Sequence, residues 1–156
     1  MDLAAVGATA GQAGDVVRHP AGEDHLRRVR GAGRDGLVEE ALGWLEATLA
    51  EQGRAMVYSS APPEERSPGA AGLLERALAA VAARAARLGA RRIVVAGGET
   101  SGAVVNAPGV TGAVVGAEAD RGVPWLLTTG DPSLALLLKS GNFGRPDLLV
   151  TALEAP

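Results

Sequence analysis

The amino-acid sequence predicts an α/β domain, Rossmann-like and layered, whose sheet is largely parallel or mixed. Short apolar runs of strand length alternate along the chain with longer segments of helical periodicity. The strand candidates are continuously apolar, as expected of strands buried on both faces. The chain has 156 residues, about one domain by the usual length prior of ~150 residues. Because 47% of the residues are hydrophobic and only 3% are aromatic, we expect a core of Ala, Val and Leu.

The first half of the chain is expected to contain a helix, a strand and a loop after an opening segment. Residues 1–34, rich in Gly, Ala, Arg and Asp, are expected to form a short opening element and an exposed connection. A helix is expected from Asp35 to a stop at Gly53. Its apolar residues share one helical face: Leu37, Val38, Ala41, Leu42, Leu45 and Leu49. The stretch "RAMVYSSA" (54–61) predicts a strand, and "APPEERSPG" (61–69) predicts a surface loop.

The second half is expected to continue the alternation of helices and strands. A helix over 70–89 has Gly89 at the position of a C-terminal cap. A strand over 92–96 and a glycine turn follow, and then a short helix from about Thr100 that Pro108 ends. The remaining predicted elements are strands over 110–117, 124–129 and 134–139 and a closing helix over 145–154.

Composition excludes several classes of function. The chain has no cysteine, which excludes disulfides, thiolate zinc sites and cysteine nucleophiles. His19 and His25 have no ligand spacing to a third partner. A formal net charge of -3 and the lack of a basic, aromatic-interleaved face argue against a nucleic-acid partner. Neither a secretory signal nor an apolar stretch of the ~18 residues that a membrane span needs is found, so we expect a cytoplasmic protein without membrane contact.

A glycine turn is the first candidate site. The stretch "RRIVVAGGETSGAVV" (91–105) leads from a β-branched strand directly into Gly97 and Gly98. Such a turn before a helix leaves backbone N–H groups unpaired and favours an anion. Thr100 and Ser101 can donate hydroxyls to a phosphate, or they can cap the helix. The spacing fits neither a P-loop nor a dinucleotide fingerprint, and an ordinary strand-to-helix turn stays an alternative.

Glu99 follows the two glycines, and its negative charge would repel a phosphate bound at this turn. A carboxylate beside a phosphate repels it unless a cation lies between them, so a functional Glu99 implies Mg²⁺, held directly or through water. The alternative is an acidic residue in the first helical turn, stabilised there by the helix dipole.

A second candidate site lies in "LALLLKSGNFG" (134–144), where an apolar strand ends at Lys139. This residue is the only lysine among the 15 lysines and arginines of the chain. Its compact ammonium, followed by Ser140, Gly141 and Asn142, suits a phosphate. The alternative is a solvated lysine before a turn. Two such loops at strand ends favour a ligand site, because ligands of parallel sheets bind at the carboxyl ends of the strands.

These stretches resemble a known family. "VVAGGETSGAVV", "GVPW" at 122–125 and "LALLLKSGNFG", in this order and spacing, are similar to the C-terminal nucleotide-binding domain of the four-carbon acid sugar kinases, which include 3-oxo-tetronate, threonate and erythronate kinases. The resemblance covers about residues 35–155. "TAGQ" at 9–12 resembles, more loosely, the stretch where the family's chain crosses into this domain.

The resemblance implies a nucleotide site and its partners. It implies that residues 35–156 form a nucleotide-binding domain, and that the sugar acid and the catalytic base come from an N-terminal domain absent from this chain. That sugar-acid-binding domain would act in cis or in trans. Glu99 is the candidate ligand of Mg²⁺, through water. The family's two loops bind ATP, which implies nucleotide contacts for these residues: Gly97, Gly98, Glu99, Thr100, Ser101, Lys139, Ser140, Gly141 and Asn142.

We therefore expect the ATP-binding domain of a kinase that phosphorylates a four-carbon sugar acid, with ATP or ADP and Mg²⁺ as its ligands. The chain alone is expected to be inactive without the substrate domain. A non-catalytic module that senses nucleotides or binds a partner, and retains the fold, is the alternative. A face that normally meets the other domain would be exposed and could drive formation of a homodimer.

Overall fold

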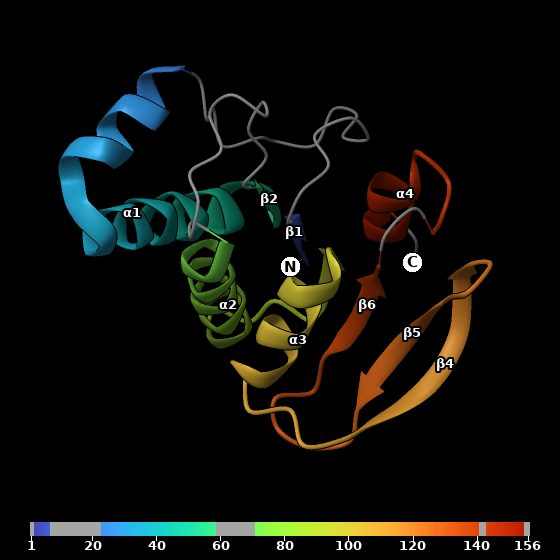
Figure 1. The fold of residues 1–156 in the computed structure, drawn as a ribbon. Coiled ribbons are helices and arrows are strands. Elements are labelled where there is room, and N and C mark those ends of the chain that lie inside the picture. Colours follow the sequence, from blue (N-terminus) through green and yellow to red (C-terminus); the bar gives the residue numbers. More distant parts are fainter. Residues whose placement is uncertain (1, 7–22, 59–70, 141–142, 155–156) are drawn as a thin grey trace.

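The computed structural model describes residues 2–6, 23–58, 71–140 and 143–154. Strands and helices alternate through most of this chain (Figure 1). The strands are β1 (Asp2–Val6), β2 (Arg54–Tyr58), β3 (Arg92–Ala96), β4 (Ala113–Asp120), β5 (Val123–Thr128) and β6 (Ala135–Lys139). The helices are α1 (Glu23–Gln52), α2 (Ala71–Arg87), α3 (Gly98–Asn106) and α4 (Leu148–Glu154). None of the helices in these ranges is long and apolar enough to cross a membrane.

One mixed sheet joins all the described strands, in the order β2-β1-β3-β6-β5-β4. The first four strands of this order are parallel to one another, and β5 and β4 are antiparallel additions at one side. The predicted class, an α/β domain with a largely parallel or mixed sheet, is confirmed. Strand β1 lies between β2 and β3, so the opening segment of the chain contributes an inner strand.

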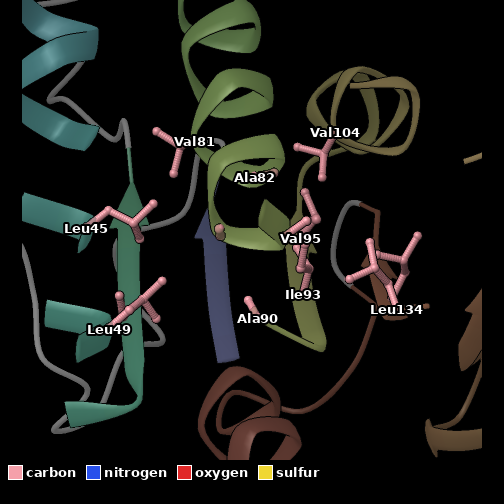
Figure 2. Packing of buried hydrophobic residues seen from close by; sticks show 13 residues of the cluster. Leu45, Leu49, Val81, Ala82, Ala90, Ile93, Val95, Val104 and Leu134 are labelled. Carbon is pink, nitrogen blue, oxygen red and sulfur yellow. The ribbon is translucent and has the colours of Figure 1, made fainter. Parts of the chain in front are cut away.

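Two apolar clusters lie on opposite faces of the sheet because successive strand residues point to opposite sides. In the first cluster, Ile93 and Val95 of β3 pack with residues of α1, α2 and α3, among them Leu45, Val81 and Val104 (Figure 2). In the second cluster, Val94 and Ala96 of β3 pack with Met56, Leu137 and residues of α4. The domain is therefore layered, with three helices over one face and α4 over the other.

Small residues allow α2 to approach the sheet closely. Ala82, Ala85 and Ala90 are fully buried in the first cluster. Helix α2 ends at Arg87, and Gly89 follows with a φ of 95°, in the left-handed region that glycine tolerates. The predicted C-terminal cap at Gly89 is thereby confirmed. The core has few large aromatic side chains, and small alanine side chains fill the space between α2 and the sheet instead.

Several predicted boundaries differ from the structure. Helix α1 begins at Glu23 rather than Asp35, because part of the expected connection is helical, although it ends at Gln52 before Gly53 as predicted. Helix α3 begins at Gly98, earlier than Thr100. Strand β4 extends to Asp120, and α4 begins at Leu148. The loop predicted over 61–69 lies outside the described residues.

The expectation that the strands are buried on both faces is wrong for the hairpin of β4 and β5. This hairpin extends away from the helices at the edge of the sheet (Figure 1). Val114 and Val115 are 58% and 67% exposed. A run of apolar residues does not distinguish a buried parallel strand from an edge strand of this kind.

Candidate functional site

The two glycine loops singled out in the sequence meet at one edge of the sheet. Strands β3 and β6 are parallel neighbours, and their last residues, Ala96 and Lys139, lie in register. The N–H of Gly97 donates a hydrogen bond of 2.8 Å to the carbonyl of Lys139. The carboxyl end of β1 lies beside Ala96 at the same edge. "TAGQ" at 9–12, which follows β1, lies outside the described residues.

The glycines of the first loop have distinct roles. Gly97 has a φ of 124° and a ψ of 127°, a conformation that side-chain-bearing residues rarely adopt. Gly98 opens α3, and a Cβ built on it would lie 3.4 Å from Oγ of Ser140. The backbone of Gly98 in the first loop therefore lies directly against the side chain of Ser140 in the second loop.

The amino end of α3 presents backbone donors at this junction. The N–H of Ser101 donates to the carbonyl of Gly97 at 2.9 Å, which closes the first helical turn. Among the described residues, the N–H groups of Gly98, Glu99 and Thr100 have no backbone partner. Unpaired N–H groups and the helix dipole together favour an anion at such an end.

Thr100 and Ser101 differ in how their hydroxyls are used. The Ser101 hydroxyl donates a 2.7 Å hydrogen bond to the carbonyl of Gly97, so its one proton is already engaged within the turn. Thr100 is 7% exposed, and no hydrogen bond joins its hydroxyl to any described residue. A buried hydroxyl without a partner is unfavourable, and a bound ligand would remove that penalty.

Lys139 is buried rather than solvated. It is 3% exposed and lies at the end of β6, on the same face as Leu137 by strand alternation. The residue also has a further polar or electrostatic interaction within the protein. The alternative of a solvated lysine before a turn is therefore wrong. Ser140 is exposed beside it, and Gly141 and Asn142 lie outside the described residues.

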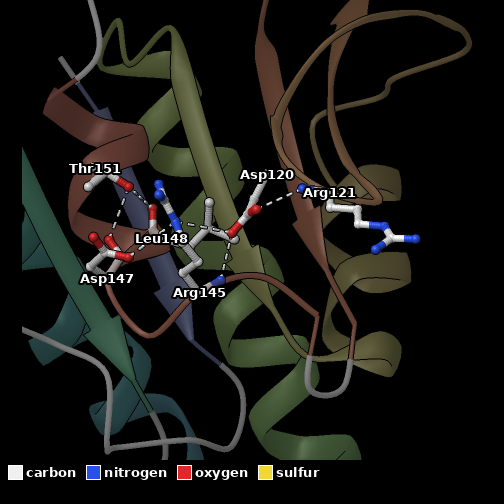
Figure 3. Close-up of polar contacts among 6 residues, drawn as sticks. All are labelled: Asp120, Arg121, Arg145, Asp147, Leu148 and Thr151. Carbon is white, nitrogen blue, oxygen red and sulfur yellow. Dashed lines mark hydrogen bonds and ion pairs between the residues drawn. The ribbon is translucent and has the colours of Figure 1, made fainter.

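The far end of the second loop is attached to the hairpin of β4 and β5. Asp120, at the end of β4, accepts hydrogen bonds of 2.7 Å from the backbone N–H groups of Arg145 and Arg121 (Figure 3). The Nε of Arg145 lies 3.5 Å from the same carboxylate. These backbone donors, that of Arg145 first, hold the pKa of Asp120 below its ordinary value. Sequence reasoning missed Asp120; the Asp-Arg-Gly turn between two strands is the signal that could have found it.

Glu99 is exposed at the first turn of α3. No group of three or more His, Asp or Glu side chains able to hold a metal occurs within the part of the chain that the structure describes. Mg²⁺ commonly combines one or two carboxylates with substrate phosphates and water. The single carboxylate of Glu99 therefore fits an ion that arrives with a phosphate ligand, rather than one held by protein groups alone.

Comparison with known protein families assigns the class of the chain. A family described as "nucleotide-binding C-terminal domain" matches residues 4–149. The chain belongs to this family. The match includes residues 4–6 of β1 and the segment after it, as well as both glycine loops.

The chain is also similar to curated proteins named 3-oxo-tetronate kinase. The chain is 47% identical over 129 residues to a 3-oxo-tetronate kinase of Methylobacterium radiotolerans, a match of 77% of this chain and 30% of the relative. It is 42% identical over 140 residues to a 3-oxo-tetronate kinase of Burkholderia multivorans, covering 85% of this chain and 32% of the relative. The chain thus spans about a third of these relatives. The resemblance to the C-terminal domain of the four-carbon acid sugar kinases is confirmed.

Solved structures share the fold. A Haemophilus influenzae protein matches 97% of this chain with a TM-score of 0.71 and 25% sequence identity, over 40% of its own length. A citrate-bound, domain-swapped dimer from Bordetella bronchiseptica matches 97% of this chain with a TM-score of 0.56 and 27% identity, over 38% of its own length. The fold of the described residues is therefore one that occurs within longer proteins.

Proposed function

We propose that this chain is the ATP-binding domain of a kinase that phosphorylates a four-carbon sugar acid of the 3-oxo-tetronate, threonate or erythronate type. The observation that carries the proposal is the junction of the two loops. There the start of α3, whose first N–H groups have no backbone partner among the described residues, lies against the loop that begins at Lys139 through Gly98 and Ser140. The same helical turn carries buried Thr100, whose hydroxyl has no hydrogen bond to a described residue. Family membership and the relatives' names support the same reading.

The phosphates of ATP or ADP would bind at this junction. Gly97 and Gly98 would let the phosphates approach the backbone, because neither carries a side chain. The N–H groups of Gly98, Glu99 and Thr100 would donate to phosphate oxygens. Ser101 would support the turn through its bond to Gly97. Lys139 would supply positive charge, with Ser140, Gly141 and Asn142 completing the second loop.

Mg²⁺ would accompany the nucleotide. When bound, the ion would neutralise phosphate charge, which is one of the two main requirements of phosphoryl transfer, positioning being the other. Glu99 would hold it through water, and its own negative charge is tolerated beside the phosphates only with such a cation between them. The exposure of Glu99 at the helix start leaves its carboxylate accessible for that role.

The sugar acid and the catalytic base would belong to a separate sugar-acid-binding domain, linked in cis or acting in trans. This proposal rests on coverage, since the chain spans 30% and 32% of the two kinases described above. Phosphoryl transfer depends mainly on positioning and charge neutralisation. One domain that orients ATP and another that orients the acceptor hydroxyl can therefore share the reaction.

Calorimetry of the chain with MgATP tests the proposal, with adenosine as the control ligand. We expect MgATP and MgADP to bind and adenosine to bind much more weakly, because the junction recognises phosphates. At ~100 times its Kd, the nucleotide should stabilise the fold by about 2.7 kcal/mol and raise the melting temperature. The absence of both heat and a melting shift at millimolar MgATP would contradict the proposal.

A further inference from the structure

We propose that Phe143 is a nucleotide-binding residue: the open face of its ring stacks on the base of the bound nucleotide. This inference rests on the proposed function and deepens it, because the candidate residues of the two loops contact only phosphates and Mg²⁺. Phe143 is the only phenylalanine of the chain, and it is 60% exposed. Aromatic rings stack favourably on other planar ring systems, and a nucleotide carries one such system, its base.

Described contacts place Phe143 beside the junction of the two loops. Its N–H donates a hydrogen bond of 3.3 Å to the carbonyl of Ser140. Oγ of Ser140 in turn lies 3.4 Å from the position of a Cβ built on Gly98, the first residue of α3. A nucleotide whose phosphates bind at the start of α3 therefore has the ring of Phe143 within reach of its base.

The turn between β4 and β5 supports the ring of Phe143. A Cβ built on Gly122 would lie 3.5 Å from Cδ1 and 3.7 Å from Cε1 of Phe143. These two atoms form one edge of the ring, and the residue is 60% exposed, so the contact leaves a ring face open. A ring that is already held in position loses little conformational entropy when a base stacks on it.

The same contact gives the stretch "GVPW" (122–125) a part in the site. Gly122 has a φ of 72°, in the left-handed region that glycine tolerates. Val123 is 1% exposed and belongs to the second apolar cluster, so it anchors the turn in the core. Gly122 can therefore present bare backbone to Phe143 from a fixed position. Neither residue contacts the nucleotide, but both support the ring that does.

The surroundings of Phe143 differ from those of a protein-docking surface. The other large hydrophobic residues that are exposed in the described chain are Val114, Val115 and Leu127. They lie on the strands of the hairpin, where Val114 and Leu127 are in register, whereas Phe143 lies against the turn at its end. Docking surfaces are contiguous apolar patches. A single ring apart from the other exposed apolar side chains fits one planar group instead.

Calorimetry with MgATP and with magnesium tripolyphosphate, which has the phosphates without the base, tests the proposal. We expect Phe143→Ala to weaken MgATP binding about tenfold, within the range for a lost base–aromatic stack, and to leave tripolyphosphate binding unchanged. MgGTP should weaken by a similar factor, since every base has a π-face. Because the side chain is largely exposed, the melting temperature of Phe143→Ala should stay close to that of the wild type.

Three further variants serve as controls. Phe143→Trp keeps an aromatic ring and should bind MgATP nearly as the wild type does. Phe143→Leu keeps an apolar side chain without a π-face and should lose MgATP affinity as the alanine variant does. Leu127→Ala removes a 49% exposed apolar side chain from the same hairpin and should match the wild type for both ligands.

The outcomes separate this inference from the proposed function. An unchanged MgATP affinity in Phe143→Ala and Phe143→Leu would overturn the role of Phe143. An equal loss of affinity for MgATP and tripolyphosphate would overturn it as well, since the ring would then support the phosphate site rather than contact the base. A wild type that binds neither ligand would instead overturn the proposed function on which the inference rests.

Discussion

Gly98 and Gly102 belong to the same helix but have different surroundings. A Cβ on Gly98 would lie 3.4 Å from Oγ of Ser140 at the loop junction, whereas a Cβ on Gly102 would have no atom within 4 Å. Gly98→Ala should therefore weaken MgATP binding by placing a methyl group where the phosphates approach. Gly102→Ala should leave binding unchanged and stabilise α3 by up to about 1 kcal/mol. Calorimetry and thermal melting of both variants check this pair, and equal binding by both would contradict it.

The hydroxyl of Thr100 allows binding and stability to be separated. Thr100 is 7% exposed, and its hydroxyl has no hydrogen-bond partner among the described residues. Thr100→Val retains the shape and removes the polar group, so the ligand-free protein should be as stable as the wild type or slightly more stable. MgATP binding should weaken about fivefold or more if a phosphate uses the hydroxyl. Urea unfolding and calorimetry measure the two effects, and a loss of stability without a loss of affinity would assign Thr100 to the core.

To test the charge of Lys139, the substitution must keep the volume of its buried side chain. Because the side chain is 3% exposed, an alanine would leave a cavity as well as remove the charge. Lys139→Met retains the length of the stem and should weaken MgATP binding by about 10- to 100-fold, the range for charged hydrogen bonds. Lys139→Arg should restore part of the affinity, since a planar guanidinium is not equivalent to an ammonium. Adenosine binding should respond to neither change; an unchanged MgATP affinity in Lys139→Met would remove Lys139 from the site.

At the scale of secondary-structure elements, the hairpin of β4 and β5 is held to the segment before α4 by a titratable contact. The pKa of Asp120 lies below its ordinary value of 3.8, because the carboxylate accepts from backbone N–H groups. Its contribution to stability is therefore complete above that value and is lost as the pH falls through the lowered pKa. The difference in urea midpoint between the wild type and Asp120→Asn should be constant from about pH 7 to pH 5 and should shrink below about pH 4. A difference that persists unchanged at about pH 2 would show that the ionised form of Asp120 is not what the contact requires.

Signals between neighbouring residues in the sequence predicted individual strands and the ends of helices. The strand over 92–96 and the stops at Gly53 and Gly89 are confirmed, because apolar runs and positive-φ glycines are read from neighbouring residues alone. The antiparallel hairpin and the inner position of β1 could not be predicted in this way. Both depend on which strands pair, and pairing is decided by contacts between distant parts of the chain.

The two loops of the candidate site could be predicted from the sequence, but the burial of Lys139 and the contact of Asp120 could not. Both glycine loops were found from the sequence, and their meeting at one sheet edge follows from the parallel register of β3 and β6. The burial of Lys139 was not predicted, since a lysine at a strand end is usually solvated. Asp120 was missed because the partner of its carboxylate, the N–H of Arg145, lies 25 residues away in the sequence.

At the scale of the whole molecule, the chain should bind nucleotide but transfer no phosphoryl group by itself. It spans about a third of its kinase relatives, and we propose that the acceptor and its base belong to another domain. We expect no release of ADP that depends on a sugar acid from the pure chain, and restored turnover when a sugar-acid-binding domain is added in trans. A coupled ADP assay with each four-carbon acid checks both statements. Substrate-dependent turnover by the chain alone would contradict them, and binding without turnover in any combination would favour a nucleotide-sensing module.

The measurement that tests the central claim most directly is a crystal structure of this chain with a bound, non-hydrolysable ATP analogue and Mg²⁺. The account predicts phosphate oxygens within hydrogen-bond distance of the N–H groups of Gly98, Glu99 and Thr100, and Nζ of Lys139 directed to the same phosphates. Phosphates bound elsewhere on the molecule, with these N–H groups and the Thr100 hydroxyl making no contact to the nucleotide, would contradict it.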